Sequence, residues 1–176
     1  FVVGGGYKYC QLGEGNCFLR VPAQCDWRPL VTGWYAEFAT LNQSPQGTVA
    51  YGSGRRAFEG STYDPTSHYR AAKVWQFFDE QKLDTDTLHA ISLGQLTHLR
   101  EQLANYHWPD SVRLPHEPLE NLGGFLVINT PNAAQWVEQL RTKNIWADSR
   151  GDSLRLAPPP YVLAQQLSHA VDAWPR

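Results

Sequence analysis

The hydrophobic pattern of this chain changes its period at Thr66, and this change limits the possible folds more than any other feature. Before Thr66, short apolar runs alternate with long loops rich in glycine and aromatic residues. Such runs predict short strands with irregular connections, here over 1–3, 16–21 and 47–51. After Thr66, the apolar residues recur at the spacing of a helix. We therefore expect an α/β fold.

Two consecutive amphipathic helices are predicted over roughly 66–106. In the first helix, Thr66 or Ser67 provides the N-cap, and the apolar positions are Ala71, Val74, Trp75 and Phe78. The second helix begins near Asp84, and its apolar stripe consists of Leu88, Ile91, Leu96, Leu99 and Leu103.

A small α/β unit is predicted after an extended linker that is marked by Pro109, Pro115 and Pro118. Its expected elements are, in chain order, a strand (124–129), a helix (133–143) started by Thr130-Pro131, two short strands (145–147 and 153–157) and a closing helix (161–174). This order favours a small sheet with helices on one face.

The composition argues against several classes of protein. The 176 residues include 15 Lys and Arg against 17 Asp and Glu, so the chain lacks the basic excess that nucleic-acid binding needs. No apolar run approaches the ~20 residues of a membrane-spanning helix. The three cysteines are odd in number and lie near the N-terminus of a chain too large to need disulfide bonds for stability, which favours free thiols in a reducing, cytoplasmic compartment. We expect neither a nucleic-acid partner nor a membrane partner.

Two other observations bear on metals and on the extent of the chain. His89, His98 and His107 recur every nine residues, which places successive rings on opposite helix faces, so no metal site is predicted. The sequence contains no methionine and begins with the apolar run Phe1-Val2-Val3. We interpret it as the C-terminal part of a longer polypeptide that starts inside a strand.

Lys8 is the first candidate for chemistry. It follows an apolar strand and a triple glycine at 4–6, where another group can approach the backbone closely. A lysine amine attacks carbonyl carbons only when it is neutral, and partial burial between rings such as Tyr7 and Tyr9 favours the neutral form. The alternative is a surface lysine beside a flexible turn, with its stem on one of these rings.

Arg155 is the second candidate. On the last predicted strand it points to the face opposite Leu154 and Leu156, beside the small residues Ser153 and Ala157. A guanidinium in this position can bind a carboxylate through two parallel N–H···O bonds, which lysine cannot form. The alternative is a solvent-facing arginine on a half-buried strand.

Two further segments carry donors that suit phosphate oxygens. The indole of Trp34 follows Gly33, and the hydroxyls of Ser61 and Thr62 follow Gly60. The alternatives are core packing for Trp34 and an ordinary turn before the next helix for the two hydroxyl residues. Neither segment is specific when taken alone.

Taken together and in this order, these segments resemble the C-terminal portion of a fold-type-I pyridoxal phosphate enzyme of the class V aminotransferase superfamily, closest to kynureninase. The resemblance extends from Phe1 to about Trp174. Its motifs are Tyr7-Lys8-Tyr9, the Gly13-x-Gly15 loop with the strand after it, Gly33-Trp34, Phe58-x-x-Ser61-Thr62, Asp148-x-Arg150 and Leu154-Arg155-Leu156-Ala157-Pro158.

The resemblance implies a fold and a domain organisation. The fold is the C-terminal part of a PLP-dependent transferase fold, with the end of the large-domain sheet, two long helices and a small α+β domain. Residues 1–83 would belong to the large cofactor-binding domain and residues 84–176 to the small domain.

The resemblance also implies a cofactor, pyridoxal 5'-phosphate, and roles for five residues. Lys8 would hold the cofactor as a Schiff base and later move protons at the substrate. Tyr7, Trp34 and Thr62 would lie near the cofactor phosphate, and Arg155 would hold the α-carboxylate of an amino-acid substrate. The expected partner is a second subunit, in a homodimer with a shared active site.

Several reactions are compatible with this resemblance. Kynureninase-like hydrolytic C–C cleavage in the side chain is the first, while transamination and C–S lysis share its early steps. Cysteine desulfurases carry a histidine before the lysine and a nucleophilic cysteine far downstream, whereas here Tyr7 precedes Lys8 and no cysteine follows Cys25. Desulfurase activity is therefore not expected. An alternative of another class is a non-catalytic fragment or small interaction domain that lacks the upstream half of the cofactor site.

Overall fold

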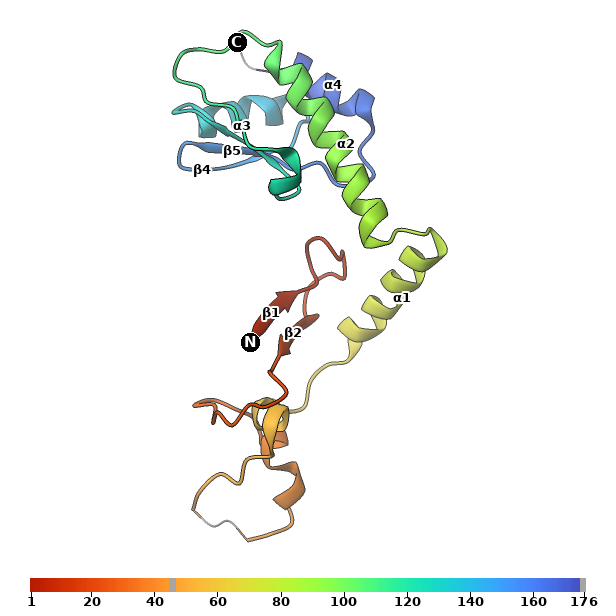
Figure 1. Cartoon of the computed structure of the whole chain (residues 1–176), viewed down its shortest axis with the longest axis vertical. Coiled ribbons are helices and arrows are strands. Elements are labelled where there is room, and N and C mark those ends of the chain that lie inside the picture. Colours follow the sequence, from red (N-terminus) through yellow and green to blue (C-terminus); the bar gives the residue numbers. More distant parts are fainter. Residues whose placement is uncertain (45–46, 175–176) are drawn as a thin grey trace. The chain divides into compact units, whose positions relative to one another are not determined.

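The computed structural model describes residues 1–44 and 47–174. The chain divides into two compact units, Phe1–Gln81 and Lys82–Arg176 (Figure 1). This division falls close to the boundary expected after residue 83, and the assignment of the two parts to a large and a small domain stays a prediction. None of the helices in the described residues is both long enough and apolar enough to cross a bilayer.

An antiparallel hairpin opens the first unit. Its strands are β1 (Val2–Gly5) and β2 (Cys17–Arg20), which confirms the first two predicted strands. Apolar side chains are exposed on both strands; Val3 is 78% and Phe18 is 60% exposed. Strands that are apolar on both faces are typical of sheets covered on both sides. The pattern fits the expected position of this hairpin at the end of a larger sheet.

The strand predicted over 47–51 is wrong. The N–H of Ala50 donates to the carboxylate of Glu37 at 2.7 Å, and the N–H of Gly52 donates to the carbonyl of Ala36 at 2.7 Å. The backbone of this segment therefore binds a neighbouring helical turn instead of a second strand.

Three helical segments complete the first unit: η1 (Trp34–Thr40), η2 (Gly54–Phe58) and α1 (Thr66–Glu80). Helix α1 confirms the first predicted helix. Its buried side chains are Ala71 and Phe78, which belong to the predicted apolar positions.

The second unit begins with α2 (Thr85–Ala104), which starts after Asp84 as predicted. The carboxylate of Asp84 accepts a hydrogen bond from the backbone N–H of Thr87 at 2.8 Å. This bond, and a weaker contribution from the Thr87 side chain, hold the pKa of Asp84 below its usual range. A short helix, η3 (Leu119–Asn121), lies in the proline-rich stretch that follows.

A three-stranded antiparallel sheet forms the centre of the second unit. The spatial order of its strands is β3 (Leu126–Asn129), β5 (Ser153–Leu156) and β4 (Asp148–Arg150). Helix α3 (Ala133–Thr142) follows β3, and α4 (Ala164–Asp172) follows β5. The predicted order of elements is confirmed (Figure 1).

Two predicted boundaries in this unit are wrong. The strand expected at 145–147 lies three positions later, because the two-residue loop Gly151-Asp152 fixes the pairing of β4 with β5. Gly151 has a φ of +55°, as a tight hairpin loop requires. The closing helix, expected over 161–174, is shorter because Leu163 is still extended, with φ −82° and ψ 152°.

Two predicted N-caps are also wrong. Pro65 holds the N-cap position of α1, and the Asp64 carboxylate accepts hydrogen bonds from the hydroxyl and the N–H of Thr66, at 2.6 and 2.9 Å. The bond from the Thr66 hydroxyl, and to a smaller extent the bond from its N–H, hold the pKa of Asp64 below its usual range. Asn132 is the N-cap of α3, and the Thr130 hydroxyl accepts a hydrogen bond from its N–H at 3.2 Å.

The core of the second unit lies on one face of the sheet. Leu126 pairs with Leu156 and Ile128 pairs with Leu154, so all four side chains point to the same face, and all are buried. Side chains from α2, α3 and α4 complete this cluster. The opposite face carries the alternate strand residues, which include Arg155.

Shortening Leu154 tests this core. Its side chain is fully buried, so Leu154→Ala is expected to lower the free energy of unfolding by ~2–5 kcal/mol, from lost burial and the cavity left behind. Leu163→Ala is the matched control, because that side chain is 66% exposed, and its effect should stay within ~0.5 kcal/mol. Urea denaturation followed by circular dichroism measures both, and equal midpoints for the two variants would contradict the assigned core.

Candidate functional site

Lys8 lies in the loop between β1 and β2, and backbone hydrogen bonds close this loop. Gly6 donates to Asn16 at 2.8 Å, Leu12 donates to Gly6 at 2.9 Å, and Gln11 donates to the carbonyl of Lys8 at 2.9 Å. A Cβ on Gly6 would lie 2.5 Å from the Leu12 side chain and 3.1 Å from the Asn16 carbonyl. A side chain at position 6 would therefore force Leu12 to move.

Helix α1 fixes the far side of the same loop. The Ser67 hydroxyl donates to the carbonyl of Gly15 at 3.2 Å, and Arg70 Nε donates to the carbonyl of Leu12 at 2.7 Å. A second guanidinium nitrogen of Arg70 donates to the carbonyl of Glu14. The loop that carries Lys8 is thus attached to a 15-residue helix as well as to the hairpin.

The side chain of Lys8 is exposed, and the expected burial between aromatic rings is not found. Its Nζ lies 5.4 Å from the centroid of the Tyr7 ring, while Tyr9 is 70% exposed. Among the described residues, the Lys8 amine makes no ion pair and no hydrogen bond. The structure therefore presents a primary amine, with one aromatic neighbour, on a fixed loop.

Trp34 and Thr62 belong to segments that the structure brings together. The N–H of Gly33 donates to the carbonyl of Glu59 at 3.3 Å, and the N–H of Tyr35 donates to the carbonyl of Gly60 at 3.0 Å. Trp34 therefore begins η1 beside the extended segment that leads to Thr62. Its ring stacks on Phe38, with the centroids 5.7 Å apart.

The hydrogen-bond donors of Trp34, of Thr62 and of Tyr7 in the Lys8 loop remain available. Trp34 is 44% and Tyr7 is 48% exposed, and Thr62 is exposed as well. Within 1–44 and 47–174, the indole N–H and the two hydroxyls have no hydrogen-bond partner. Core packing, the alternative considered for Trp34, is therefore not what the structure shows.

Gly33→Ala is expected to disrupt the contact between segment 33–35 and segment 59–60. A Cβ at Gly33 would lie 2.2 Å from the backbone carbonyl of Gly60, so the backbone must move, at a cost of ~1–3 kcal/mol in unfolding free energy. Gly60→Ala is the matched control, since a Cβ there meets open space. Urea denaturation followed by tryptophan fluorescence compares the two variants, and equal stability would show that this contact tolerates a side chain.

Arg155 lies in the second unit, on the central strand β5, and points to the open face of the sheet as predicted. Its Nε donates to Asp148 Oδ1 at 2.8 Å, and its Nη2 is paired with Asp148 Oδ2. The guanidinium carbon lies 5.9 Å from the centroid of the Phe125 ring. Arg155 thus already holds a carboxylate in the two-bond arrangement that was expected for a substrate.

Sequence reasoning did not predict this partner. The strand expected at 145–147 left Asp148 outside the sheet, whereas the observed register places it directly opposite Arg155. The Gly151-Asp152 turn was the signal that could have found it, because a two-residue loop pairs Arg150 with Ser153 and therefore Asp148 with Arg155.

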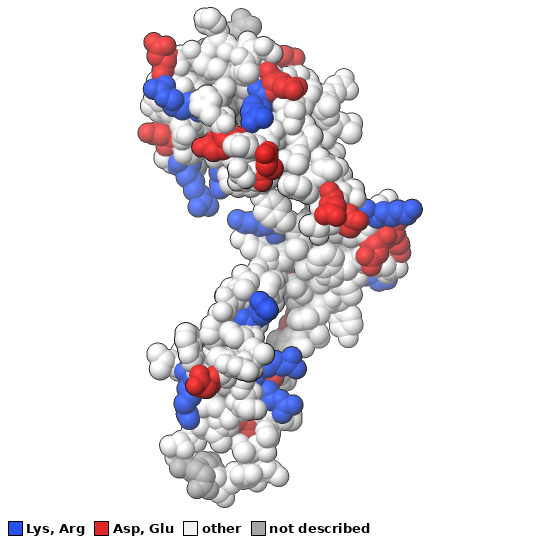
Figure 2. All heavy atoms as spheres, in the orientation of Figure 1, with Lys and Arg blue, Asp and Glu red and all other residues white. Residues whose placement is uncertain are grey.

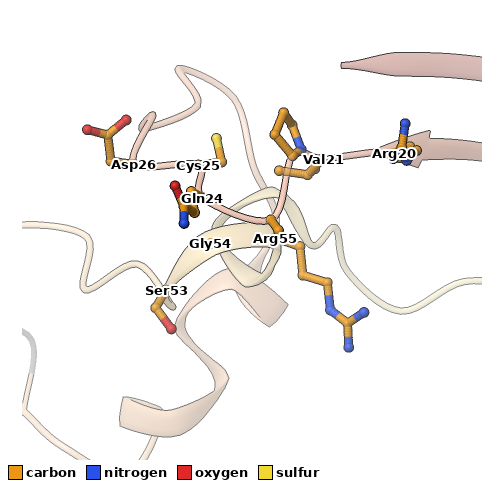
Figure 3. A pocket seen from close by; sticks show the side chains of 10 residues that line it. Arg20, Val21, Gln24, Cys25, Asp26, Ser53, Gly54 and Arg55 are labelled. Atoms are coloured by element: carbon orange, nitrogen blue, oxygen red, sulfur yellow. The ribbon is translucent and has the colours of Figure 1, made fainter.

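A wide depression on the surface of the first unit does not coincide with the predicted site. It has a volume of about 940 Å³ and is open to solvent, and its side chains include Arg20, Cys25, Asp26 and Arg55. These side chains point away from one another, so they do not converge on a ligand (Figure 3). In the described residues, no group of three or more His, Cys, Asp or Glu could hold a metal ion.

Surface charge does not mark a site on the second unit either. Basic and acidic side chains are interspersed over the face of this unit that Figure 2 shows. On that face of the second unit, no patch of one sign therefore indicates a binding site.

Comparisons with known proteins give fold relatives only. No protein-family model and no curated protein matches the sequence. The solved structure of cysteine desulfurase CsdA (S-sulfonic acid) from Escherichia coli matches with a TM-score of 0.64 and 13% identity, over 82% of this chain and 37% of that one. A NifS-like protein matches with a TM-score of 0.57 and 14% identity, over 89% and 40%.

These matches bear on the resemblance stated above. This chain spans about two fifths of each matched chain, and at 13% and 14% identity these matches show the fold alone. Neither match is a kynureninase, so that part of the interpretation stays a prediction. The chain shares its α/β fold with part of each of these cysteine desulfurase and NifS-like structures.

Proposed function

We propose that this chain is part of a PLP-dependent enzyme that acts on an amino acid, with Lys8 as the residue that binds the cofactor covalently. The observation that carries this proposal is the Lys8 amine itself. It stands on a loop fixed by backbone hydrogen bonds and by α1, and no carboxylate neutralises it in the described residues. An amine that is accessible and not paired with a carboxylate can reach an aldehyde, with which it reacts in its neutral form.

The other groups fit the same cofactor. Pyridoxal phosphate offers one aldehyde and one phosphate. The first unit offers one such amine and three exposed donors without a partner of their own, on Tyr7, Trp34 and Thr62. Hydroxyl and indole donors are suitable partners for phosphate oxygens.

Two residues of this chain would have different roles in the reaction. The bound cofactor supplies an electron sink for negative charge that develops on the substrate carbon. Arg155 binds the α-carboxylate of the substrate and orients it. Lys8, in its neutral form, takes the proton from the α-carbon and returns a proton later in the reaction.

Within this class, we propose kynureninase-like C–C hydrolysis or a related transamination or lyase reaction, in a homodimer with a shared site. Sulfur transfer, the activity named for one matched structure, needs a nucleophilic cysteine downstream of the lysine. No cysteine follows Cys25 in this sequence. This difference supports the C–C-cleaving or transaminating interpretation.

A substrate screen tests the proposed function. Full-length protein with added pyridoxal phosphate is incubated with kynurenine, hydroxykynurenine and a panel of amino acids, and the products are identified by mass spectrometry. Alanine with an aromatic acid supports C–C hydrolysis, whereas keto acids support transamination. Absence of turnover together with absence of bound cofactor would favour the non-catalytic alternative.

A further inference from the structure

The pairing of Arg155 with Asp148 is built into the sheet. The two residues are directly opposite each other in β5 and β4, and the hairpin loop at Gly151 sets that register. Asp148 uses both carboxylate oxygens, one on Nε and one on Nη2. Such a bidentate pair fixes the plane of the guanidinium as well as its position.

Other contacts hold the same side chain from different directions. The flanking residues Leu154 and Leu156 are buried in the core, which fixes the backbone at Arg155. The Phe125 ring lies 5.9 Å from the guanidinium carbon. The Arg155 side chain is 30% exposed and that of Asp148 is 56% exposed, so the pair lies at the surface of the open face and not in the core.

We propose that Asp148 is a positioning residue, which orients the Arg155 guanidinium for the carboxylate of an amino-acid substrate. This inference rests on the proposed role of Arg155. A guanidinium has two edges that match a carboxylate, the Nε–Nη edge and the Nη–Nη edge, in one plane. By binding the first edge, Asp148 sets the plane in which the second edge meets a substrate, and so reduces the ordering that substrate binding must supply.

Two measurements test this role, with Asp148→Asn as the variant. The dissociation constant of L-alanine is measured on cofactor-loaded full-length protein from the change in the cofactor absorbance. The Nε–H signal of Arg155 is measured by NMR on the cofactor-free chain, and it is assigned by its loss in Arg155→Lys. We expect about tenfold weaker binding of L-alanine and a displaced Nε–H signal.

Two further variants separate positioning from damage to the fold. Asp152→Asn removes the same charge from the hairpin loop, outside the pairing of Asp148 with Arg155, and it should change neither measurement. Asp148→Glu retains a carboxylate and should bind L-alanine more tightly than Asp148→Asn does.

The outcomes distinguish this inference from the proposed function. If Arg155→Lys weakens L-alanine binding while Asp148→Asn does not, the positioning role is wrong and the proposed function stands. If Asp148→Asn strengthens binding, Asp148 competes with the substrate, which also overturns positioning. If neither variant changes binding, the role of Arg155 itself is wrong.

Discussion

Replacing Lys8 with alanine is expected to abolish covalent attachment of pyridoxal phosphate and to lower turnover by at least ~10³-fold. The reason is that one amine is assigned both the attachment of the cofactor and the proton transfers at the substrate. Absorbance spectra report the attachment, and the rate of product formation with the best substrate from the screen reports turnover.

Lys73→Ala is the matched control for this variant. Lys73 lies on α1, where its Nζ binds the side-chain oxygen of Gln76 at 3.0 Å, and its loss should leave both measurements unchanged. Added ethylamine should restore part of the turnover of Lys8→Ala, because a free amine can replace the missing one. A Lys8→Ala protein with wild-type spectrum and turnover would remove Lys8 from the site.

Replacing Arg155 with leucine is expected to weaken binding of amino-acid substrates by ~2–5 kcal/mol, because the substrate carboxylate loses its bidentate partner. Arg155→Lys should also bind weakly, since an ammonium keeps the charge without the planar fork. The colour of the bound cofactor should remain in both variants. Substrate titration followed by absorbance measures binding and cofactor together.

The control for this prediction is Arg141→Leu. Arg141 also pairs with a carboxylate, that of Glu138 at 2.9 Å, but no role at the site is assigned to it. Unchanged substrate binding in Arg155→Leu, or an equal loss in Arg141→Leu, would contradict the assignment of Arg155 to the substrate carboxylate.

The elements of this fold that depend on local sequence were predictable. Helix α2 starts after Asp84 because a short carboxylate side chain accepts a hydrogen bond from an N–H of the first turn. The hairpin β1–β2 and the strand β3 were also predictable, because apolar runs bounded by loops indicate strands without knowledge of their partners.

Features set by contacts between distant residues were not predictable. The segment 47–51 has strand-like residues, but the N–H of Ala50 binds Glu37, and the N–H of Gly52, which follows the segment, binds Ala36. Ser67, a good capping residue, instead binds the carbonyl of Gly15, 52 positions earlier. In both cases a tertiary hydrogen bond replaced the local structure that propensity favours.

The candidate site likewise combines residues that local sequence indicates with contacts that only the folded chain creates. Lys8 and Arg155 stood out in the sequence because each follows or occupies a strand in a recognisable motif. The closing of the Lys8 loop by Arg70 and the pairing of Arg155 with Asp148 depend on the folded register. The sequence therefore indicated the two candidate groups, whereas the structure was needed to find the residues that contact them.

The most direct test of the central claim is to map the lysine that binds the cofactor. Full-length protein is mixed with pyridoxal phosphate and reduced with borohydride, and the modified peptide is identified by mass spectrometry. We expect the pyridoxyl label on Lys8. A label on Lys73, Lys82 or Lys143, or no label on any lysine, would contradict the claim.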